Sequence, residues 1–118
     1  DTLWVFGGYS VCNDDIRDVV QVYDPEMLGW CGMTALQPGR AFASALAVNE
    51  RLWIIGGKTG EKLFQHSAVM AEIAIYDPAT DGWEEGPSLP QPLHSCSSVV
   101  LGRKLMVFGG KGEDPLQL

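Results

Sequence analysis

The sequence predicts an all-β fold that repeats with a period of about 53 residues. Three short apolar runs each end in a Gly-Gly pair, at residues 7–8, 56–57 and 109–110. The segment Tyr-Asp-Pro begins at residue 23 and again at residue 76, which is 53 residues later. No stretch of helical length carries apolar residues at the 3.6-residue spacing of an amphipathic helix. Regularly spaced short apolar runs separated by turn residues are typical of β-strands.

The repeat aligns over its whole length without a gap. Residues 23–57 match residues 76–110, and ten of these 35 positions are identical. The Gly-Trp pairs at 29–30 and 82–83 keep the same offset of 53 residues. A fixed period near 50 residues indicates the blades of a β-propeller, in which each repeat forms one small sheet.

Each repeat contains four predicted strands. Small apolar residues predict strands over Phe42–Val48 and Ser95–Leu101. Polar turns follow, and then come the strands that end in Gly-Gly, at residues 3–6, 52–55 and 105–108. Alternating residues around tyrosine predict strands over Val19–Asp24 and Ile73–Asp77. A tight turn that begins at Asp-Pro and ends at Gly leads into the strand that starts at tryptophan.

The repeated residues have structural reasons that come before any functional ones. Glycine has no Cβ, so a Gly-Gly pair can take positive φ and lets neighbouring backbone approach closely. Each tyrosine and tryptophan can bury on the order of 150–250 Å² and so fill the wedge between two blades. The positions predicted to be structural are Gly7, Gly8, Tyr23, Trp30, Gly56, Gly57, Tyr76, Trp83, Gly109 and Gly110.

Gly-Gly followed by Tyr-Asp, six residues and Trp resembles the Kelch repeat, and the resemblance covers nearly the whole chain. It implies four-stranded blades with strands A to D from the centre outward. Residues 38–89 would then form one complete blade. Residues 1–37 would supply strands B, C and D of a partial blade, and residues 90–118 strands A and B of another. Because a propeller closes into a ring of four to eight blades, residues 1–118 would form part of one propeller.

Composition and charge exclude several classes of partner. Fifteen acidic and eight basic residues give a net charge of −7, whereas nucleic acids and anionic membranes attract clustered Lys and Arg. No apolar run approaches the roughly 20 residues of a membrane helix. Cys12, Cys31 and Cys96 have neither zinc-site nor disulfide spacing, so we expect reduced thiols in a cytoplasmic protein. Cys96 is expected to be a small buried residue.

No motif in the sequence predicts catalysis, a metal site or a cofactor. Gly57-Lys58-Thr59 looks like the end of a phosphate-binding loop, but that motif needs glycine where Leu52 stands and a helix afterwards. His66 and His94 have no metal-ligand partners nearby in sequence, and His94 is interpreted as a loop or packing residue. Adjacent strand residues point to opposite faces, so Glu84 and Glu85 are not a carboxylate pair. We therefore expect a protein without enzymatic activity.

The change in loop length between the two repeats favours the loop after Gly-Gly as a place for partner binding. From Gly8 to Tyr23 there are 15 positions and from Gly57 to Tyr76 there are 19, so this B–C loop alone changes length. Loops held by a rigid scaffold commonly carry specificity. The chain also resembles the Kelch-like (BTB-BACK-Kelch) adaptors, whose propellers contact substrate just after Gly-Gly and at the start of strand A. By position this implies the partner-binding residues Tyr9, Ser10, Phe42, Lys58, Thr59, Ser95 and Lys111.

One departure from those adaptors concerns arginine. Many of their propellers place Arg at the start of strand A to bind acidic peptides, whereas Phe42 and Ser95 stand there in this sequence. Arg40 lies two residues before Phe42, and its counterpart in the next repeat is Leu93. The sequence therefore does not imply a carboxylate-rich ligand.

Three functions remain open from the sequence. The first is substrate recognition for a cullin-RING ubiquitin ligase, with the cullin bound through domains outside this chain. The second is a Kelch scaffold without a ligase role, such as an actin-binding or trafficking protein. The third is part of a propeller enzyme whose catalytic ligands come from other blades. The first two would hold a protein partner and need no cofactor, and a shared fold by itself does not choose among the three.

Overall fold

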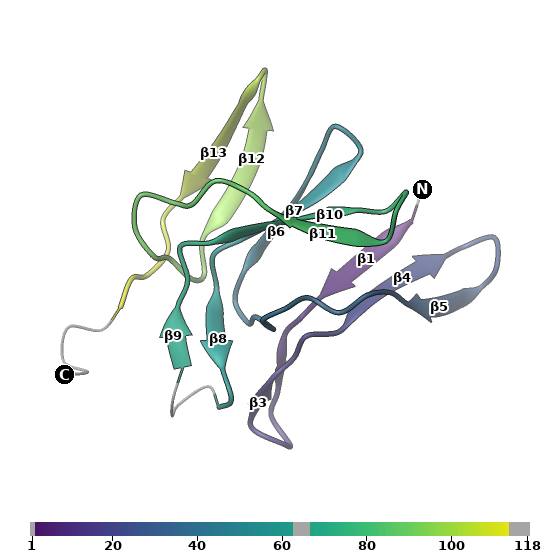
Figure 1. Cartoon of the computed structure of the whole chain (residues 1–118), viewed down its shortest axis with the longest axis horizontal. Coiled ribbons are helices and arrows are strands. Elements are labelled where there is room, and N and C mark those ends of the chain that lie inside the picture. The colour runs from purple at the N-terminus through teal and green to yellow at the C-terminus, as the bar shows by residue number, and fades with distance from the viewer. Residues whose placement is uncertain (1, 63–66, 114–118) are drawn as a thin grey trace.

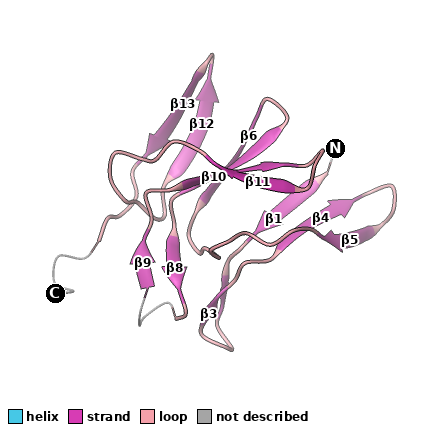
Figure 2. Ribbon diagram, in the orientation of Figure 1, coloured by secondary structure: helices cyan, strands magenta, loops and turns pink. Residues whose placement is uncertain are grey.

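The structure, a computed structural model, describes residues 2–62 and 67–113. Within these residues it contains β-strands and no helix (Figures 1 and 2). His66, considered above for metal binding, lies outside the described residues. The strands are β1 (Leu3–Phe6), β2 (Tyr9–Ser10), β3 (Asp15–Ile16), β4 (Val20–Asp24), β5 (Gly29–Gly32), β6 (Ser44–Val48), β7 (Arg51–Ile55), β8 (Lys58–Gly60), β9 (Ser67–Val69), β10 (Ile73–Asp77), β11 (Gly82–Glu85), β12 (Ser97–Leu101) and β13 (Lys104–Phe108).

One complete four-stranded blade lies in the middle of the chain. Its strands pair antiparallel in the order β6-β7-β10-β11, which is the predicted order A to D. On one side of it β1, β4 and β5 form a three-stranded sheet, and on the other β12 and β13 form a two-stranded sheet (Figure 1). The predicted fold class, a partial propeller with one complete blade between two incomplete ones, is confirmed.

The predicted B–C loops contain further strands. After the Gly-Gly pairs at 7–8 and 56–57 the chain pairs with itself, as β2 with β3 and as β8 with β9. Tyr9 lies opposite Ile16 in the first hairpin, and Lys58 lies opposite Val69 in the second. These hairpins satisfy backbone N–H and C=O groups that an open loop would leave to water. The two-residue and three-residue strands are too short to show a period in the sequence.

Strand A begins two residues later than predicted. Its first residues are Ser44 and Ser97, because Phe42 and Ser95 have φ values of +59° and +60°. Left-handed backbone of this kind cannot continue a strand. Phe42 and Ser95 therefore lie at a bend before the strand rather than within it.

The Gly-Gly pairs at 7–8 and 56–57 each join one blade to the next. Gly56 has φ +64°, and a Cβ on it would lie 2.3 Å from the carbonyl oxygen of Leu93 in the following blade. The N–H of Gly57 donates to that same oxygen at 2.9 Å. Gly7 and Gly8 repeat the arrangement on the carbonyl of Arg40, with 2.2 Å to the hypothetical Cβ and 2.7 Å for the hydrogen bond. All three pairs have positive φ, as predicted.

Aromatic rings fill the space between the first and second sheets. Tyr76 is fully buried, and its ring centroid lies 5.3 Å from that of Trp4 and 6.1 Å from that of Phe6. Trp83 packs 4.9 Å from Tyr76 and 5.8 Å from Phe6. Its indole N–H donates across the interface to the carbonyl of Thr34 at 3.0 Å. The predicted packing role of Tyr76 and Trp83 matches these contacts.

A carboxylate links the same two sheets at their outer edge. Asp81 accepts hydrogen bonds from the Tyr76 hydroxyl at 2.5 Å and from the backbone N–H and hydroxyl of Thr34 at 3.0 and 2.8 Å. The bond from Tyr76, together with those from Thr34, holds the pKa of Asp81 below its usual range. In the first repeat the aligned residue is Leu28, so this link belongs to the second blade alone.

Arg40 is a structural residue. Its guanidinium is buried and donates to the carbonyls of Ile54, Gly56 and Glu72 at 3.1, 3.2 and 2.8 Å. Burial lowers the pKa of the Arg40 guanidinium. These bonds fix the end of β7 and the start of β10, so Arg40 does not offer its charge to a partner.

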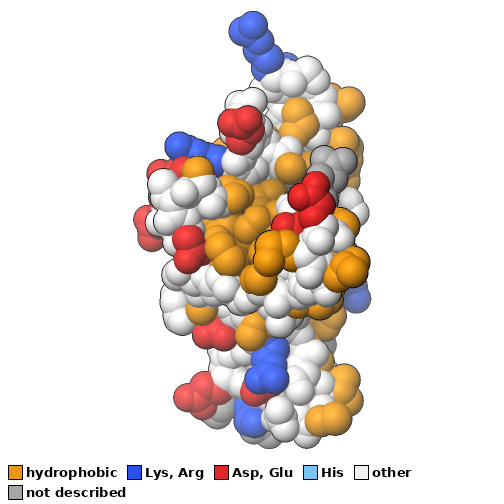
Figure 3. Space-filling view, turned by 90° about the vertical axis from the view of Figure 1, so that its right-hand side faces the viewer, with side chains coloured by type: hydrophobic (Ala, Val, Ile, Leu, Met, Phe, Trp, Pro, Cys, Tyr) orange, Lys and Arg blue, Asp and Glu red, His pale blue; other side chains and the backbone are white. Residues whose placement is uncertain are grey.

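The outward face of the first sheet is apolar and uncovered among the described residues. Leu3, Tyr23 and Trp30 lie side by side on it by strand register, and Trp30 is 50% exposed. Figure 3 shows hydrophobic side chains gathered in the middle of the side of the molecule on which β4 and β5 lie. That Trp30 fills a wedge between two blades stays a prediction, because no described residue supplies the neighbouring blade. The corresponding face of Trp83 is covered by β1, whereas nothing described covers Trp30.

Substituting Gly56 with alanine should destabilise the chain. The positive φ alone costs about 1–2 kcal/mol for a residue with a Cβ, and the clash with the Leu93 carbonyl adds to it. Gly32→Ala is the control, because a Cβ there meets nothing within 4 Å. Urea unfolding of both variants would test this. Equal stability of the two variants would contradict the close approach.

Truncating the two repeated tryptophans should have unequal effects on the 118-residue chain. Trp83→Ala is expected to cost about 3–5 kcal/mol, because this partly buried side chain packs against the core and against the rings of Phe6 and Tyr76. Trp30→Ala is expected to cost roughly 1–2 kcal/mol, because half of this side chain already lies in water. The measurement is the free energy of unfolding in urea. An unchanged free energy for Trp83→Ala would refute the packing described above.

Candidate functional site

The residues predicted to bind a partner lie at one end of the sheets, where the B strands leave and the A strands begin. The hairpins β2–β3 and β8–β9 project from this end, at the bottom of Figure 1. The turn between β12 and β13 lies at the opposite end. Three short segments therefore meet at this end: the hairpins after Gly-Gly, residues 41–42 and residues 94–95.

Backbone hydrogen bonds connect these segments into a row. Lys58 and Ala41 exchange two bonds, at 2.8 and 2.9 Å. The N–H of Ser95 donates to the carbonyl of Phe42 at 2.8 Å. His94 and Lys111 exchange two more, at 2.9 and 2.8 Å. This row runs from the second blade into the third, and main-chain hydrogen bonds fix it. Its residues, in order, are Lys58, Ala41, Phe42, Ser95, His94 and Lys111.

Phe42 and His94 lie next to each other in this row. Phe42 is 47% exposed, close to the 50% of Trp30 and Phe108. Its ring centroid lies 6.2 Å from that of His94. The Nδ1 atom of His94 shares a hydrogen bond of 2.9 Å with the hydroxyl of Ser95.

Two lysines flank the histidine. Lys58 and Lys111 occupy the same position in successive repeats, directly after Gly-Gly. Burial lowers the pKa of His94, and the positive charges of Lys58 and Lys111 lower it further. The surroundings of His94 therefore favour its neutral form over the imidazolium ion.

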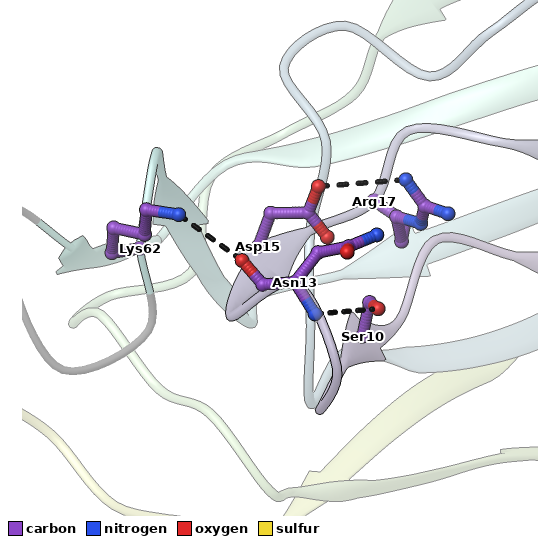
Figure 4. A network of polar contacts seen from close by, with 5 residues as sticks. All are labelled: Ser10, Asn13, Asp15, Arg17 and Lys62. Carbon is purple, nitrogen blue, oxygen red and sulfur yellow. Dashed lines mark hydrogen bonds and ion pairs between the residues drawn. The ribbon is translucent and has the colours of Figure 1, made fainter.

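Tyr9, Ser10 and Thr59 lie on the hairpins and not in the row. The Tyr9 hydroxyl donates to Asp14 at 2.6 Å, and this bond raises the pKa of Tyr9. The two hairpins touch each other (Figure 4), because Lys62 Nζ donates to the carbonyl of Asn13 at 3.1 Å.

Further contacts brace the first hairpin from within. The backbone N–H of Asn13 donates to the Ser10 hydroxyl at 3.4 Å, and Arg17 pairs with Asp15 at the same distance. The structure thus brings Phe42, Lys58, Ser95 and Lys111 together and sets Tyr9, Ser10 and Thr59 on braced hairpins beside them.

Sequence reasoning missed the place of His94. It was interpreted as a loop or packing residue because it stands alone in the sequence. Its neighbours come from two other segments, which only the backbone pairing brings near. One signal was available: His94 aligns with Ala41, so it is a polar replacement within the repeat and directly precedes Ser95.

In residues 2–62 and 67–113 no three His, Cys, Asp or Glu side chains are placed to hold a metal ion. Cys12, Cys31 and Cys96 are free thiols, and Cys96 is buried as predicted. Lys58–Gly60 forms strand β8 and does not start a helix.

Glu84 of the adjacent acidic pair lies in an ion pair, and the described residues form no helix. Glu84 pairs with Arg51 at 2.6 Å. No helix of the described residues is long and apolar enough to cross a membrane.

Comparison with known proteins agrees with this geometry. A family profile described as "Kelch motif" matches residues 39–90. Alpha-scruin of Limulus polyphemus is 32% identical over 114 residues, covering 92% of this chain and 12% of that protein. Kelch repeat and BTB domain-containing protein 12 of Danio rerio is 32% identical over 127 residues, covering 95% of this chain and 20% of that protein.

The fold of the chain is also similar to that of a solved structure. The structure of YjhT superimposes with a TM-score of 0.74 at 21% identity, covering 93% of this chain and 31% of the other. At that identity the likeness shows the fold alone. The chain spans 12% and 20% of the two curated relatives compared above.

The repeated sheets and their Gly-Gly junctions define a blade-repeat β-propeller. The matched motif and the relatives narrow this description: residues 39–90 carry a Kelch motif, and the chain is similar to Kelch-repeat proteins.

The pKa of His94 should respond to the lysines on either side. Lys58→Gln and Lys111→Gln should each raise it toward its ordinary value, because each substitution removes a positive charge that disfavours the imidazolium ion. NMR titration of the imidazole C–H signals would measure this, and His66→Gln would assign the two histidines. Lys104→Gln, in the β12–β13 turn at the opposite end, is the control. No change in either flanking variant would contradict the arrangement.

Proposed function

We propose that the chain forms part of a protein-interaction surface in which the end of the propeller carrying Phe42 and Lys58 captures a protein partner. The observation that carries this proposal is the half-exposed Phe42 in a row fixed by backbone hydrogen bonds. A rigid aromatic side chain loses little conformational freedom on binding, and such residues are frequent anchors of interfaces. The seven partner-binding residues predicted from the sequence belong to this proposal.

The wider role that we propose is substrate recognition for a cullin-RING ubiquitin ligase in the cytoplasm. In that role the cullin is bound by domains outside this chain, and the propeller selects the substrate. One relative carries both Kelch repeats and a BTB domain in its name, which supports this choice. The proposed role needs no enzymatic activity and no cofactor in this chain.

Co-precipitation from cells tests the ligase role on the full-length protein. We expect a cullin to be recovered with it and, after proteasome inhibition, ubiquitinated substrates that are lost when the propeller end is altered. Actin co-sedimentation without cullin recovery would favour the Kelch scaffold instead. Turnover of a small molecule by the purified protein, without either partner, would favour an enzyme.

The partner-binding surface is tested by single substitutions in the full-length protein. Tyr9→Ala, Phe42→Ala and Lys58→Ala should each weaken capture of the partner found above, with the largest loss, about tenfold or more, for Phe42→Ala. Met27→Ala and Lys104→Ala are matched controls. Met27 is an exposed apolar residue in the β4–β5 turn, and Lys104 begins β13 at the opposite end. Unaltered capture by all three site variants would refute the proposed surface.

A further inference from the structure

A cavity lies beside the segment that joins the first sheet to the second. Gln37, Pro38 and Arg40 of that segment form one wall, and strands β10 and β11 of the second blade form the other. The volume of the cavity is about 240 Å³. Pockets for drug-sized ligands measure roughly 300–1,000 Å³, so this cavity has room for one side chain and a short piece of backbone. It shares no residue with the row described above.

The lining of the cavity carries three carboxylates. Glu72 lies just before β10, and Glu84 and Glu85 end β11. The charge of Glu84 is offset by Arg51 at 2.6 Å. Glu72 and Glu85 form no ion pair with any residue in 2–62 or 67–113. Their negative charges therefore remain for a cationic ligand.

A buried hydrogen-bond donor borders the same cavity. Arg40 is 4% exposed, and its Nη1 atom donates to three carbonyls, which offset its positive charge. Its Nε–H group has no hydrogen-bond partner among the described residues. Buried polar groups are nearly always hydrogen-bonded, and each exception calls for an explanation. Carboxylates without an ion pair are ordinary in a chain of net charge −7, but here two of them share a cavity with a buried donor that lacks an acceptor.

Neighbouring contacts hold the acceptors in place. Glu72 accepts a hydrogen bond at one carboxylate oxygen from the backbone N–H of Ala71 at 3.1 Å, which leaves the other oxygen for a ligand. The amide nitrogen of Gln37 donates to Asp18 at 3.2 Å, which leaves the amide oxygen as an acceptor. Trp83 adds an aromatic side chain to the lining, and aromatic rings attract cations.

The blade fold does not require these charged residues. At the aligned positions of the other repeats they are replaced by uncharged ones: Leu93 for Arg40, Val19 for Glu72 and Gly32 for Glu85. The charged set thus belongs to one junction between blades, as a ligand site would.

We propose that this cavity binds one basic side chain, arginine or lysine, from a peptide segment of a protein. The positive group lies against Glu72 and Glu85, and a backbone carbonyl of the same segment accepts the Nε–H of Arg40. Hydrogen bonds from a cation to a carboxylate are charge-assisted and stronger than neutral ones. The site goes beyond the proposed function because it uses none of the residues of the row.

Saturation-transfer difference NMR with arginine derivatives tests the proposal on the full-length protein. The probe is N-acetyl-arginine amide, and its neutral counterpart of nearly the same shape is N-acetyl-citrulline amide. We expect the arginine probe to bind at least about tenfold more tightly than the citrulline probe, because only the former makes charge-assisted hydrogen bonds. Equal binding of the two, or no binding of the arginine probe, would overturn the proposal.

Ethylguanidinium tests the contribution of Arg40, since it has the charge of the probe but no carbonyl group. We expect it to bind more weakly than N-acetyl-arginine amide. Equal binding of these two compounds would overturn the assignment of the ligand to a peptide segment.

Two double variants locate the binding on the protein. Glu72→Gln/Glu85→Gln preserves the size of both side chains and should weaken binding of the arginine probe about tenfold or more. Glu26→Gln/Glu50→Gln removes two charges from the β4–β5 and β6–β7 turns and should leave the affinity within about twofold, because neither residue lines the cavity. Equal losses in both double variants would show that binding follows overall charge and would refute the site. Circular dichroism of each variant checks that it is folded.

Discussion

The approach of the Gly-Gly pairs at 7–8 and 56–57 to a carbonyl group of the next blade is the constraint on which the structure depends. A Cβ at Gly56 would lie 2.3 Å from the Leu93 oxygen, so no other residue fits without moving one blade from its neighbour. The adjacent N–H of Gly57 then binds the same oxygen. One pair of glycines therefore sets both the spacing of two sheets and the direction in which the chain leaves strand B.

Packing of the blades follows from that spacing. Tyr76 and Trp83 fill the space beside Trp4 and Phe6, and Asp81 ties the outer edge to Thr34. The same face of the first sheet carries Trp30 but has no neighbour among the described residues. An aromatic position in the repeat is thus buried by the adjacent blade and not by its own sheet.

The candidate binding surface lies at the same junction between blades. The residues that follow Gly-Gly turn toward the segment before strand A, and backbone hydrogen bonds hold Lys58, Phe42 and Lys111 near His94. Because main-chain bonds carry the geometry, these side chains can vary without loss of the fold. A repeat protein can in this way change its partner while its blades stay the same.

The sequence by itself determined the all-β class, the period and the strand order, since glycines, aromatics and turn residues repeat at a fixed offset and act locally. It also placed Cys96 in the core and gave Tyr76 its packing role. Only the tertiary structure decided that Trp30 is exposed, that Arg40 is buried against carbonyls, and that strand A begins after Phe42 and Ser95. It alone brought His94 between two lysines 36 and 17 residues away in sequence. These features depend on contacts between blades, which no local pattern of residues encodes.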